Sequence, residues 1–313
     1  MFNYKTKNPV PVSDKGEKMI PNFLEGKLEK QYGTDLKNQI MEGFKVGRKV
    51  TLRINTLKTD IDFIKSELSK NNIDFKEVSW SKEALIIENK IEQDLEELDV
   101  YKEGKIYLQS LSSMLPPIIL NPEEGIDILD MAAAPGGKTT QMAALTNNKA
   151  NITACEMNKI RAEKLKYNIN MQGASRVFVM EKDARNIDNF FSFDKILLDS
   201  PCSGSGTLVE SNPNNERYFT EMLIEKVTKT QFLLLEKASN ILKKGCEMVY
   251  STCSILEEEN EKILEKILKQ GKLEIVPIEF EGIPILPSKI PGTICVMPNE
   301  LYEGFFVAKL KKK

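Results

Sequence analysis

Two of the five cysteines in this chain stand where a thiol could do chemistry. Cys202 and Cys253 each follow an apolar run that predicts a buried strand, and each lies among small polar residues typical of a turn. A thiolate in such a turn can act as a nucleophile that forms a covalent intermediate. A cysteine is more often a small buried hydrophobic residue, and we expect that role for the other three. These are Cys155, Cys246 and Cys295.

The residue types that are missing limit how such a thiol could be activated. The 313 residues include no histidine, which excludes Ser-His and Cys-His catalysis and most zinc sites, and we predict no metal centre. The number of cysteines is odd and no CxxC pair occurs, so a disulfide framework is not expected. A nearby lysine, with Lys138 as the candidate, and the N-terminal dipole of a helix are the remaining means of lowering a thiol pKa.

A loop rich in small residues indicates a site for a nucleotide-like cofactor. The apolar run 126–129 is followed by Asp130 and then by a segment that leads directly into a predicted helix. Two glycines and the free N–H groups at the helix start let a ligand lie against the backbone. The loop is neither GxGxxG nor a P-loop, because the spaced first glycine of a P-loop is missing. Its predicted cofactor-binding residues are Ala132, Ala133, Ala134, Pro135, Gly136, Gly137 and Lys138.

Acidic residues stand at the ends of the strands that follow. Glu156 lies 20 positions after Gly136, where a carboxylate that binds ribose hydroxyls is expected. Asp183 follows the next predicted strand and could hold the adenine edge, and Asp199 ends the strand after that. Any one of these acids is more often a cap or turn residue. With Asp130 there are four acids at four consecutive strand ends, and together with the glycine loop they favour an adenosyl cofactor.

The elements that would position these residues alternate between strand and helix from residue 101 onward. Repeated strand–helix units with continuous apolar strands predict an α/β fold, built on a doubly wound, mostly parallel sheet with its ligands at the carboxyl ends of the strands. The predicted strands cover residues 126–129, 152–155, 177–180, 195–198, 248–250, 273–277 and 305–310. The predicted helices cover residues 138–145, 159–171, 221–244 and 258–270.

The first hundred residues show a different pattern, which predicts a small α+β unit. We therefore divide the chain into an N-terminal domain over residues 1–100 and a catalytic domain over residues 101–313. The N-terminal elements are predicted helices over 22–45 and 60–71 and predicted strands over 50–57, 75–78 and 85–87.

Composition and charge narrow the class of protein. Hydrophobic residues make up 41% of the chain and charged residues 29%, which is typical of a soluble globular protein. Neither a leader segment nor an apolar run of about 20 residues is evident, so we expect a cytoplasmic protein without a membrane partner. The net charge of −2 gives no global basic footprint for nucleic acid, but residues 1–49 contain ten Lys or Arg against six Asp or Glu. That segment could contact phosphates, although an ordinary solvated surface explains it as well.

Several segments together resemble the motifs of the RsmB/Nop/Sun family of RNA cytosine-5 methyltransferases. The resemblance covers nearly the whole chain from about residue 20. It rests on Asp130-Met-Ala-Ala-Ala-Pro-Gly-Gly-Lys-Thr-Thr140, Leu198-Asp-Ser-Pro-Cys-Ser-Gly-Ser-Gly206, Tyr250-Ser-Thr-Cys-Ser254, Glu258-Glu-Asn-Glu261, Arg53-Ile-Asn-Thr-Leu-Lys58, Gln109-Ser-Leu-Ser-Ser-Met-Leu-Pro-Pro117 and Glu303-Gly-Phe-Phe-Val-Ala308.

The resemblance implies a Rossmann-like domain that transfers a methyl group from S-adenosylmethionine to carbon 5 of cytosine in RNA. Cys253 would be the nucleophile, and Cys202 would help to expel the product. A thiolate that adds to carbon 6 makes carbon 5 nucleophilic, and base-assisted elimination then frees the methylated ring. Asp199 could stabilise the addition at the N3 or N4 edge of a base that is extruded or single-stranded. The cofactor would be contacted by residues 132–138, Glu156, Asp183 and Asp199.

The chain departs from the family pattern at several places, among them Cys295, near which an arginine is common. Ala132 stands where a cysteine is common, and Ser200 stands where an alanine is common. The segment 209–213 lacks the basic pair that usually follows the Cys202 loop, which puts the usual RNA contact in doubt.

Other functions of the same fold stay open at this stage. A DNA cytosine-5 methyltransferase would use the Pro-Cys cysteine as nucleophile, a small-molecule methyltransferase would not need the N-terminal module, and a non-catalytic RNA-binding assembly factor would not need both thiols. We expect a monomer that acts on RNA, with ribosomal RNA slightly favoured over tRNA. The sequence does not identify the target nucleotide.

Overall fold

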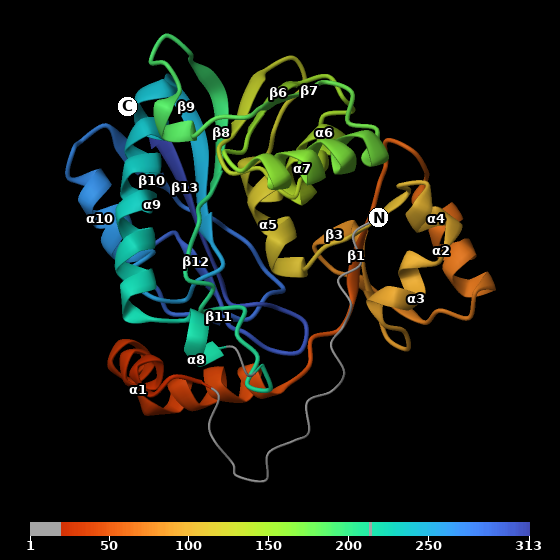
Figure 1. The fold of residues 1–313 in the computed structure, drawn as a ribbon, viewed down its shortest axis with the longest axis horizontal. Coiled ribbons are helices and arrows are strands. Elements are labelled where there is room, and N and C mark those ends of the chain that lie inside the picture. Colours follow the sequence, from red (N-terminus) through yellow and green to blue (C-terminus); the bar gives the residue numbers. More distant parts are fainter. Residues whose placement is uncertain (1–19, 213–214) are drawn as a thin grey trace.

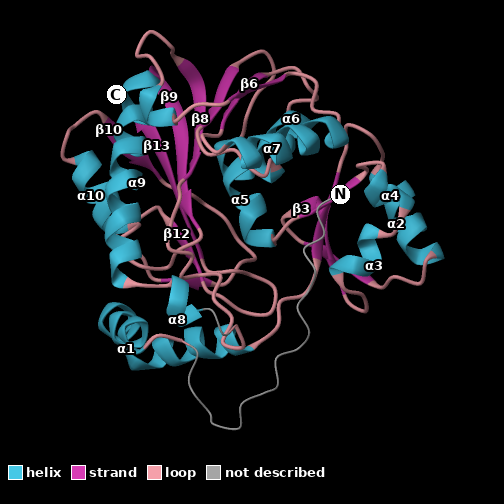
Figure 2. Ribbon diagram, in the orientation of Figure 1, coloured by secondary structure: helices cyan, strands magenta, loops and turns pink. Residues whose placement is uncertain are grey.

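The computed structural model describes residues 20–212 and 215–313, which form two β-sheets flanked by helices (Figures 1 and 2). The larger sheet has the order β11-β12-β13-β9-β8-β5-β6-β7, and β10 also pairs with β13. Its parallel strands are β5 (Asp127–Asp130), β6 (Asn151–Cys155), β7 (Val177–Met180), β8 (Phe193–Asp199) and β9 (Leu242–Thr252). Its antiparallel strands are β10 (Leu273–Val276), β11 (Ile285–Leu286), β12 (Ile294–Val296) and β13 (Phe305–Lys312).

Helices cover both faces of this sheet. Successive residues of a strand point to opposite sides, so a strand with consecutive apolar residues has an apolar side chain to bury on each face. In β8, Ile196 and Leu198 pack into one core, and Leu197 packs into the other. The first core is shared with α1 (Asn22–Lys45), α9 (Glu221–Ile241) and α10 (Glu261–Leu268). The second core is shared with α5 (Leu111–Leu120), α6 (Gly137–Leu145) and α7 (Lys159–Gln172). The predicted α/β, doubly wound sheet is confirmed, and its C-terminal strands add an antiparallel half.

The smaller sheet is antiparallel, with the order β2-β3-β1-β4, and has a hydrophobic core of its own. Its strands are β1 (Thr51–Ile54), β2 (Phe75–Val78), β3 (Ser81–Ile87) and β4 (Ile106–Leu108). Helices α2 (Ile61–Lys70), α3 (Glu92–Glu96) and α4 (Asp99–Lys102) accompany it. The strand β4 lies beyond residue 100, and the division of the chain at residues 100 and 101 stays a prediction.

A buried arginine joins the smaller sheet to the helix that follows the small-residue loop. Nε of Arg53 donates to Oε1 of Gln109 at 3.0 Å, and Nη2 donates to Oγ1 of Thr140 in α6 at 3.0 Å. Burial lowers the pKa of Arg53 to about 10, against the charges of Tyr107 and Glu83. Because unpaired buried N–H groups are costly, these bonds fix the position of α6 relative to β1.

Three predicted helices differ from those observed. The predicted helix 221–244 ends at Ile241, since Leu242 is buried and pairs with Phe193 as the start of β9. The predicted helix 258–270 begins at Glu261, after hydrogen-bonded turns. Helix α1 is interrupted at Gly33, whose φ of 78° is non-helical. Within the two described ranges, no helix combines the length and the apolar character that crossing a membrane requires.

Candidate active site

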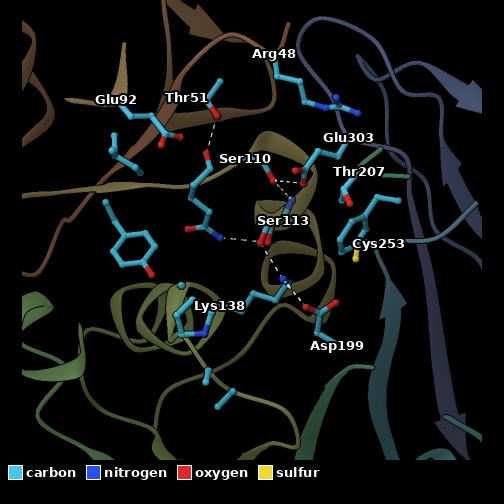
Figure 3. A pocket seen from close by; sticks show the side chains of 18 of the residues that line it. Arg48, Thr51, Glu92, Ser110, Ser113, Lys138, Asp199, Thr207, Cys253 and Glu303 are labelled. Atoms are coloured by element: carbon cyan, nitrogen blue, oxygen red, sulfur yellow. Dashed lines mark hydrogen bonds and ion pairs between the residues drawn. The ribbon is translucent and has the colours of Figure 1, made fainter. Parts of the chain in front are cut away.

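The loops after β5, β8 and β9 meet at one sheet edge, because neighbouring parallel strands end on the same side. Together with residues of the smaller sheet they line a cavity of about 450 Å³ (Figure 3). Cys202 and Gly136 belong to these loops but do not line the cavity. The predicted site residues that line it are Ala132, Ala133, Ala134, Pro135, Gly137, Lys138, Asp199 and Cys253.

Lys138 and Asp199 form an ion pair inside the cavity. Nζ of Lys138 lies 2.7 Å from Oδ2 of Asp199 and donates to Oγ of Ser113 at 2.8 Å (Figure 3). The hydroxyl of Ser251 donates to the other carboxylate oxygen, Oδ1, at 2.8 Å. Burial opposes the charge on Lys138, but the charge and hydrogen bond of Asp199 outweigh it and raise the lysine pKa. Lys138 is therefore a fixed cation, and its field extends to Cys253.

The two candidate thiols are in contact, although 51 positions separate them in the chain. Sγ of Cys202 lies 3.0 Å from Sγ of Cys253, because Asp199 at the end of β8 pairs with Ser251 near the end of β9. The hydrogen bond with Cys253, burial and the nearby charge of Glu259 raise the pKa of Cys202 well above its ordinary value. Cys202 thus keeps its proton at neutral pH, while Cys253 opens onto the cavity.

A buried carboxylate connects the two thiol loops. Oε2 of Glu259 accepts the backbone N–H of Ser203 at 2.8 Å, and Oε1 accepts the hydroxyls of Ser203 and of Ser254, the latter at 3.0 Å. Nε2 of Gln231 also donates to Oε2, at 3.3 Å. The side chain of Glu259 is fully buried, and burial raises its pKa despite these bonds. Since Ser203 follows Cys202 and Ser254 follows Cys253, Glu259 fixes both thiols at once.

The small-residue loop is shaped by its glycines. Gly136 caps α6 with a φ of 110°, a conformation that side chains rarely adopt. A Cβ on Gly137 would lie 3.1 Å from the ring of Tyr107, which also lines the cavity. Nδ2 of Asn168 donates to the carbonyl oxygen of Pro135 at 2.7 Å and so braces the loop from α7. The predicted close approach of a ligand to this backbone is therefore sterically possible.

Asp130 is a buried acid that lines the cavity. Its Oδ2 accepts the hydroxyl of Thr139 at 2.7 Å, whereas Oδ1 is buried and has no hydrogen-bond partner among the described residues. Burial raises the pKa of Asp130 to about 6, against the hydrogen bond from Thr139. A buried acceptor of this kind fits a ligand that carries a positive charge, such as S-adenosylmethionine with its sulfonium and ammonium groups.

Glu156 and Asp183 follow β6 and β7 at the same edge, but neither lines the cavity. Glu156 accepts the N–H of Asn158 at 2.8 Å and lies 3.1 Å from the guanidinium of Arg161. The hydrogen bond and charge of Arg185 lower the pKa of Asp183, although partial burial opposes this. The structure thus brings Lys138, Asp199 and both cysteines together, and leaves these two acids outside that group.

Two protein-family models match the chain. The model described as "16S rRNA methyltransferase RsmB/F" matches residues 117–311. The model described as "Methyltr_RsmF/B-like, ferredoxin-like domain" matches residues 20–94. The first alone covers more than half of the 313 residues. The chain belongs to the RsmB/F methyltransferase family.

Similar sequences and structures agree with this membership. The "Ribosomal RNA small subunit methyltransferase F" of Shewanella loihica is 36% identical in an alignment that covers 84% of this chain and 56% of that protein. The "25S rRNA (cytosine-C(5))-methyltransferase nop2" of Schizosaccharomyces pombe is 33% identical over 93% of this chain and 50% of its own length. The crystal structure of a methyltransferase homolog from Pyrococcus horikoshii covers 94% of this chain and 100% of its own, at 31% identity and a TM-score of 0.79. The chain therefore spans about half the length of the curated relatives it matches.

Several residues of this RsmB/F site were missed by sequence reasoning. Ser113 lay inside a quoted motif, but only the fold shows that it bonds Lys138. Glu259 lay in the Glu258–Glu261 motif without an assigned role, and Arg48 was counted only as one of the ten basic residues of segment 1–49. Among residues 20–212 and 215–313, no cluster of three or more Cys, Asp or Glu could hold a metal ion.

Proposed function

We propose that this RsmB/F family member transfers a methyl group from S-adenosylmethionine to carbon 5 of cytosine in RNA. The observation that carries the proposal is the contact of the two thiols at 3.0 Å beside the Lys138–Asp199 pair, at the edge of the sheet where the cofactor loop lies. A single cysteine that only fills space in a protein core would need neither a second thiol in contact with it nor an ion pair beside it. A pair with one thiol open to a cavity suits a reaction that needs both a nucleophile and a base.

In this proposal the thiols divide the work. Bound S-adenosylmethionine supplies an electrophilic methyl group. The thiolate of Cys253 forms a bond to carbon 6, and the Lys138–Asp199 pair stabilises the electron density that moves toward N3. After carbon 5 has been methylated, Cys202 as thiolate removes the proton from carbon 5. The bond between carbon 6 and Sγ of Cys253 then breaks, and the double bond of the ring is restored.

The high pKa of Cys202 is consistent with this order of events. Once the thiolate of Cys253 has bonded to carbon 6, its charge no longer raises the pKa of Cys202. The proton of Cys202 then passes to solvent, and the resulting thiolate accepts the proton from carbon 5. Lys138, held as a cation beside Asp199 in the same cavity wall as Cys253, is the proposed activating group in a chain without histidine.

For the cofactor, we propose contacts with residues 132–138 and Asp199 in the cavity. Asp130, which sequence reasoning did not assign to the site, is added as the acceptor for a positively charged group. Glu156 and Asp183 stay in the proposal as the acids for the adenosine part, since they end β6 and β7 at the same sheet edge. Their present partners, Arg161 and Arg185, lie close enough to hold both carboxylates in place.

We further propose that residues 1–100 form an RNA-binding module and residues 101–313 the catalytic domain. RNA is the proposed partner and ribosomal RNA is favoured over tRNA, because both cited curated relatives are named as rRNA methyltransferases. Monomeric action in the cytoplasm is part of the same proposal. A DNA cytosine-5 methyltransferase and a non-catalytic assembly factor remain the competing functions.

The test is to incubate the protein with S-adenosylmethionine and an unmodified 16S rRNA transcript, and then to map 5-methylcytosine by bisulfite sequencing. Parallel reactions contain a tRNA pool and a cytosine-containing DNA duplex. We expect a new 5-methylcytosine in RNA and none in DNA. Methylation of DNA alone would support the DNA enzyme, and no methylation in any of the three would support the assembly factor.

A further inference from the structure

An arginine in the wall of the cavity has two nitrogen atoms without a hydrogen-bond partner among the described residues. Arg48 lies in the connection between α1 and β1 and lines the cavity (Figure 3). Its Nη2 donates to the carbonyl oxygen of Gly206, in the Cys202 loop, at 3.1 Å. Its Nε and Nη1 are buried and have no partner among the described residues. Burial lowers the pKa of Arg48, and the charge of Glu303 opposes that shift.

Such an arrangement is unfavourable without a ligand, because buried N–H groups that bond neither protein nor water carry a desolvation penalty. A guanidinium with one N–H group fixed and two nitrogen atoms free presents a planar fork. That fork matches the oxygen atoms of a phosphate better than a lysine would.

The other cations of the cavity wall are already neutralised. Lys138 pairs with Asp199 at 2.7 Å, and Lys49 pairs with Glu88 at 2.9 Å. No carboxylate of the described residues lies within ion-pair distance of Arg48, and the nearby Glu303 instead accepts a hydrogen bond from Ser110 at 2.8 Å. Arg48 is therefore the cation of this wall that is available to an anion.

The position of Arg48 favours the nucleic acid over the cofactor. Its anchor, Gly206, belongs to the Cys202 loop, and Thr207 and Cys253 lie between Arg48 and Asp199 in Figure 3. In the proposed function, carbon 6 of the target cytosine must reach Cys253, which lines the same cavity as Arg48. The cofactor loop lies with Lys138 at the other end of the view.

The absence of basic residues in the segment after the Cys202 loop points the same way. Residues 209–212 carry no Lys or Arg, but the N–H of Glu210 donates to the carbonyl oxygen of Phe44 at 2.7 Å. This bond holds the end of α1 against that segment, four residues before Arg48. The chain thus supplies a cation at this place from the N-terminal connection.

We propose that Arg48 binds an RNA phosphate next to the target cytidine, through Nε and Nη1. The inference rests on the proposed function and specifies its contact with the substrate. Arg48 positions the strand and takes no part in bond making.

The experiment compares Arg48→Ala with Lys45→Ala in binding to the 16S rRNA transcript at several salt concentrations. Lys45→Ala is the matched control, because it removes the same charge as Arg48→Ala. Lys45 lies three residues away and pairs with Glu42 on the surface. We expect Arg48→Ala to weaken RNA binding roughly tenfold and to reduce the salt slope by about one contact. Affinity for S-adenosylhomocysteine, measured by calorimetry, should not change. Lys45→Ala should change RNA affinity less than about twofold.

Three results would overturn the inference. The first is an unchanged RNA affinity in Arg48→Ala, and the second is an equal loss of RNA affinity in Lys45→Ala. The third is a loss of S-adenosylhomocysteine affinity in Arg48→Ala with RNA binding intact, which would assign Arg48 to the carboxylate of the cofactor. Should Arg48→Ala fail to fold, Arg48→Lys keeps the charge but loses the fork, and an intermediate loss of RNA affinity with an unchanged salt slope is then expected. A wild-type protein that binds RNA through Arg48 but forms no 5-methylcytosine would contradict the proposed function alone.

Discussion

The two halves of the candidate site are built in different ways. At the ends of β6 and β7, Glu156 and Asp183 are each held by an arginine from the residues that follow. At the ends of β8 and β9, contacts connect residues far apart in sequence. There Glu259 joins the two thiol loops, and Lys138 reaches Asp199 across 61 positions. The first half relies on local contacts with partly exposed arginines, and the second on contacts between segments that are far apart in the chain.

The difference follows from the chemistry each half would perform. A ligand's hydroxyl groups can be bound by acids whose partners shift slightly, because hydrogen bonds tolerate small displacements. Covalent attack and proton removal need reacting atoms held in a narrow range of geometry. A network of bonds from separate elements supplies that rigidity, and changes in it should have larger effects than changes at Glu156 or Asp183.

The largest expected effect is at the thiols. Cys253→Ala should abolish covalent capture of RNA and lower methyl transfer by at least about 10³-fold, because the nucleophile is lost. Cys202→Ala should instead accumulate an RNA–protein adduct, visible as a band that resists denaturation in gel electrophoresis. Cys246→Ala is the control and should retain activity, because Cys246 lies within β9, the strand that Cys253 follows, and outside the cavity. If the first two outcomes were exchanged, Cys202 would be the nucleophile, as in the DNA enzymes.

The second-largest effect is expected at Glu259, which connects the two thiol loops. Glu259→Ala leaves Ser203, Ser254 and Gln231 without their buried acceptor, and should lower the free energy of unfolding by about 2–4 kcal/mol in urea titrations. The neighbouring Glu258→Ala removes a surface partner of Lys27 and should change stability by less than about 1 kcal/mol. Equal losses in the two variants would mean that Glu259 does not hold the loops.

A pH experiment tests β5, the strand between the two halves. Burial raises the pKa of Asp130 from 3.8 to about 6, so the folded protein binds this proton more tightly than the unfolded chain. The resulting stability is present below about pH 4 and is lost as the pH rises through about 6. Two pKa units correspond to about 3 kcal/mol. Asp130→Asn should remove this part of the pH dependence in thermal unfolding, whereas Asp127→Asn, at the exposed start of β5, should keep the wild-type curve.

The smallest effect is expected in the first half. Arg185→Ala removes the partly exposed partner of Asp183, and should change the free energy of unfolding by less than about 1 kcal/mol. Its effect on S-adenosylhomocysteine affinity, measured by calorimetry, should exceed its effect on stability. A stability loss as large as that of Glu259→Ala would remove the contrast between the two halves.

Much of the fold was predictable because local patterns dominate it. Continuous apolar runs identified β5, β6, β7 and β8 within a residue or two, and helices between them followed from the same periodicity. The short strands β4, β11 and β12 were not predicted, since runs of two or three residues carry no periodic signal. The end of α9 was misplaced because pairing of Leu242 with β8, a tertiary contact, decides it.

The sequence by itself determined which residues have the right chemistry, where parallel strands end, and which loop can approach a ligand closely. These follow from residue type and from spacing along the chain. The tertiary structure alone decided that Cys202 touches Cys253, that Glu259 joins their loops, that Asp130 keeps a free acceptor and that Arg48 keeps two free nitrogen atoms. The reason is physical: burial and unsatisfied hydrogen bonds depend on what surrounds an atom, and those surroundings come from distant segments, as far as the 158 positions between Arg48 and Gly206.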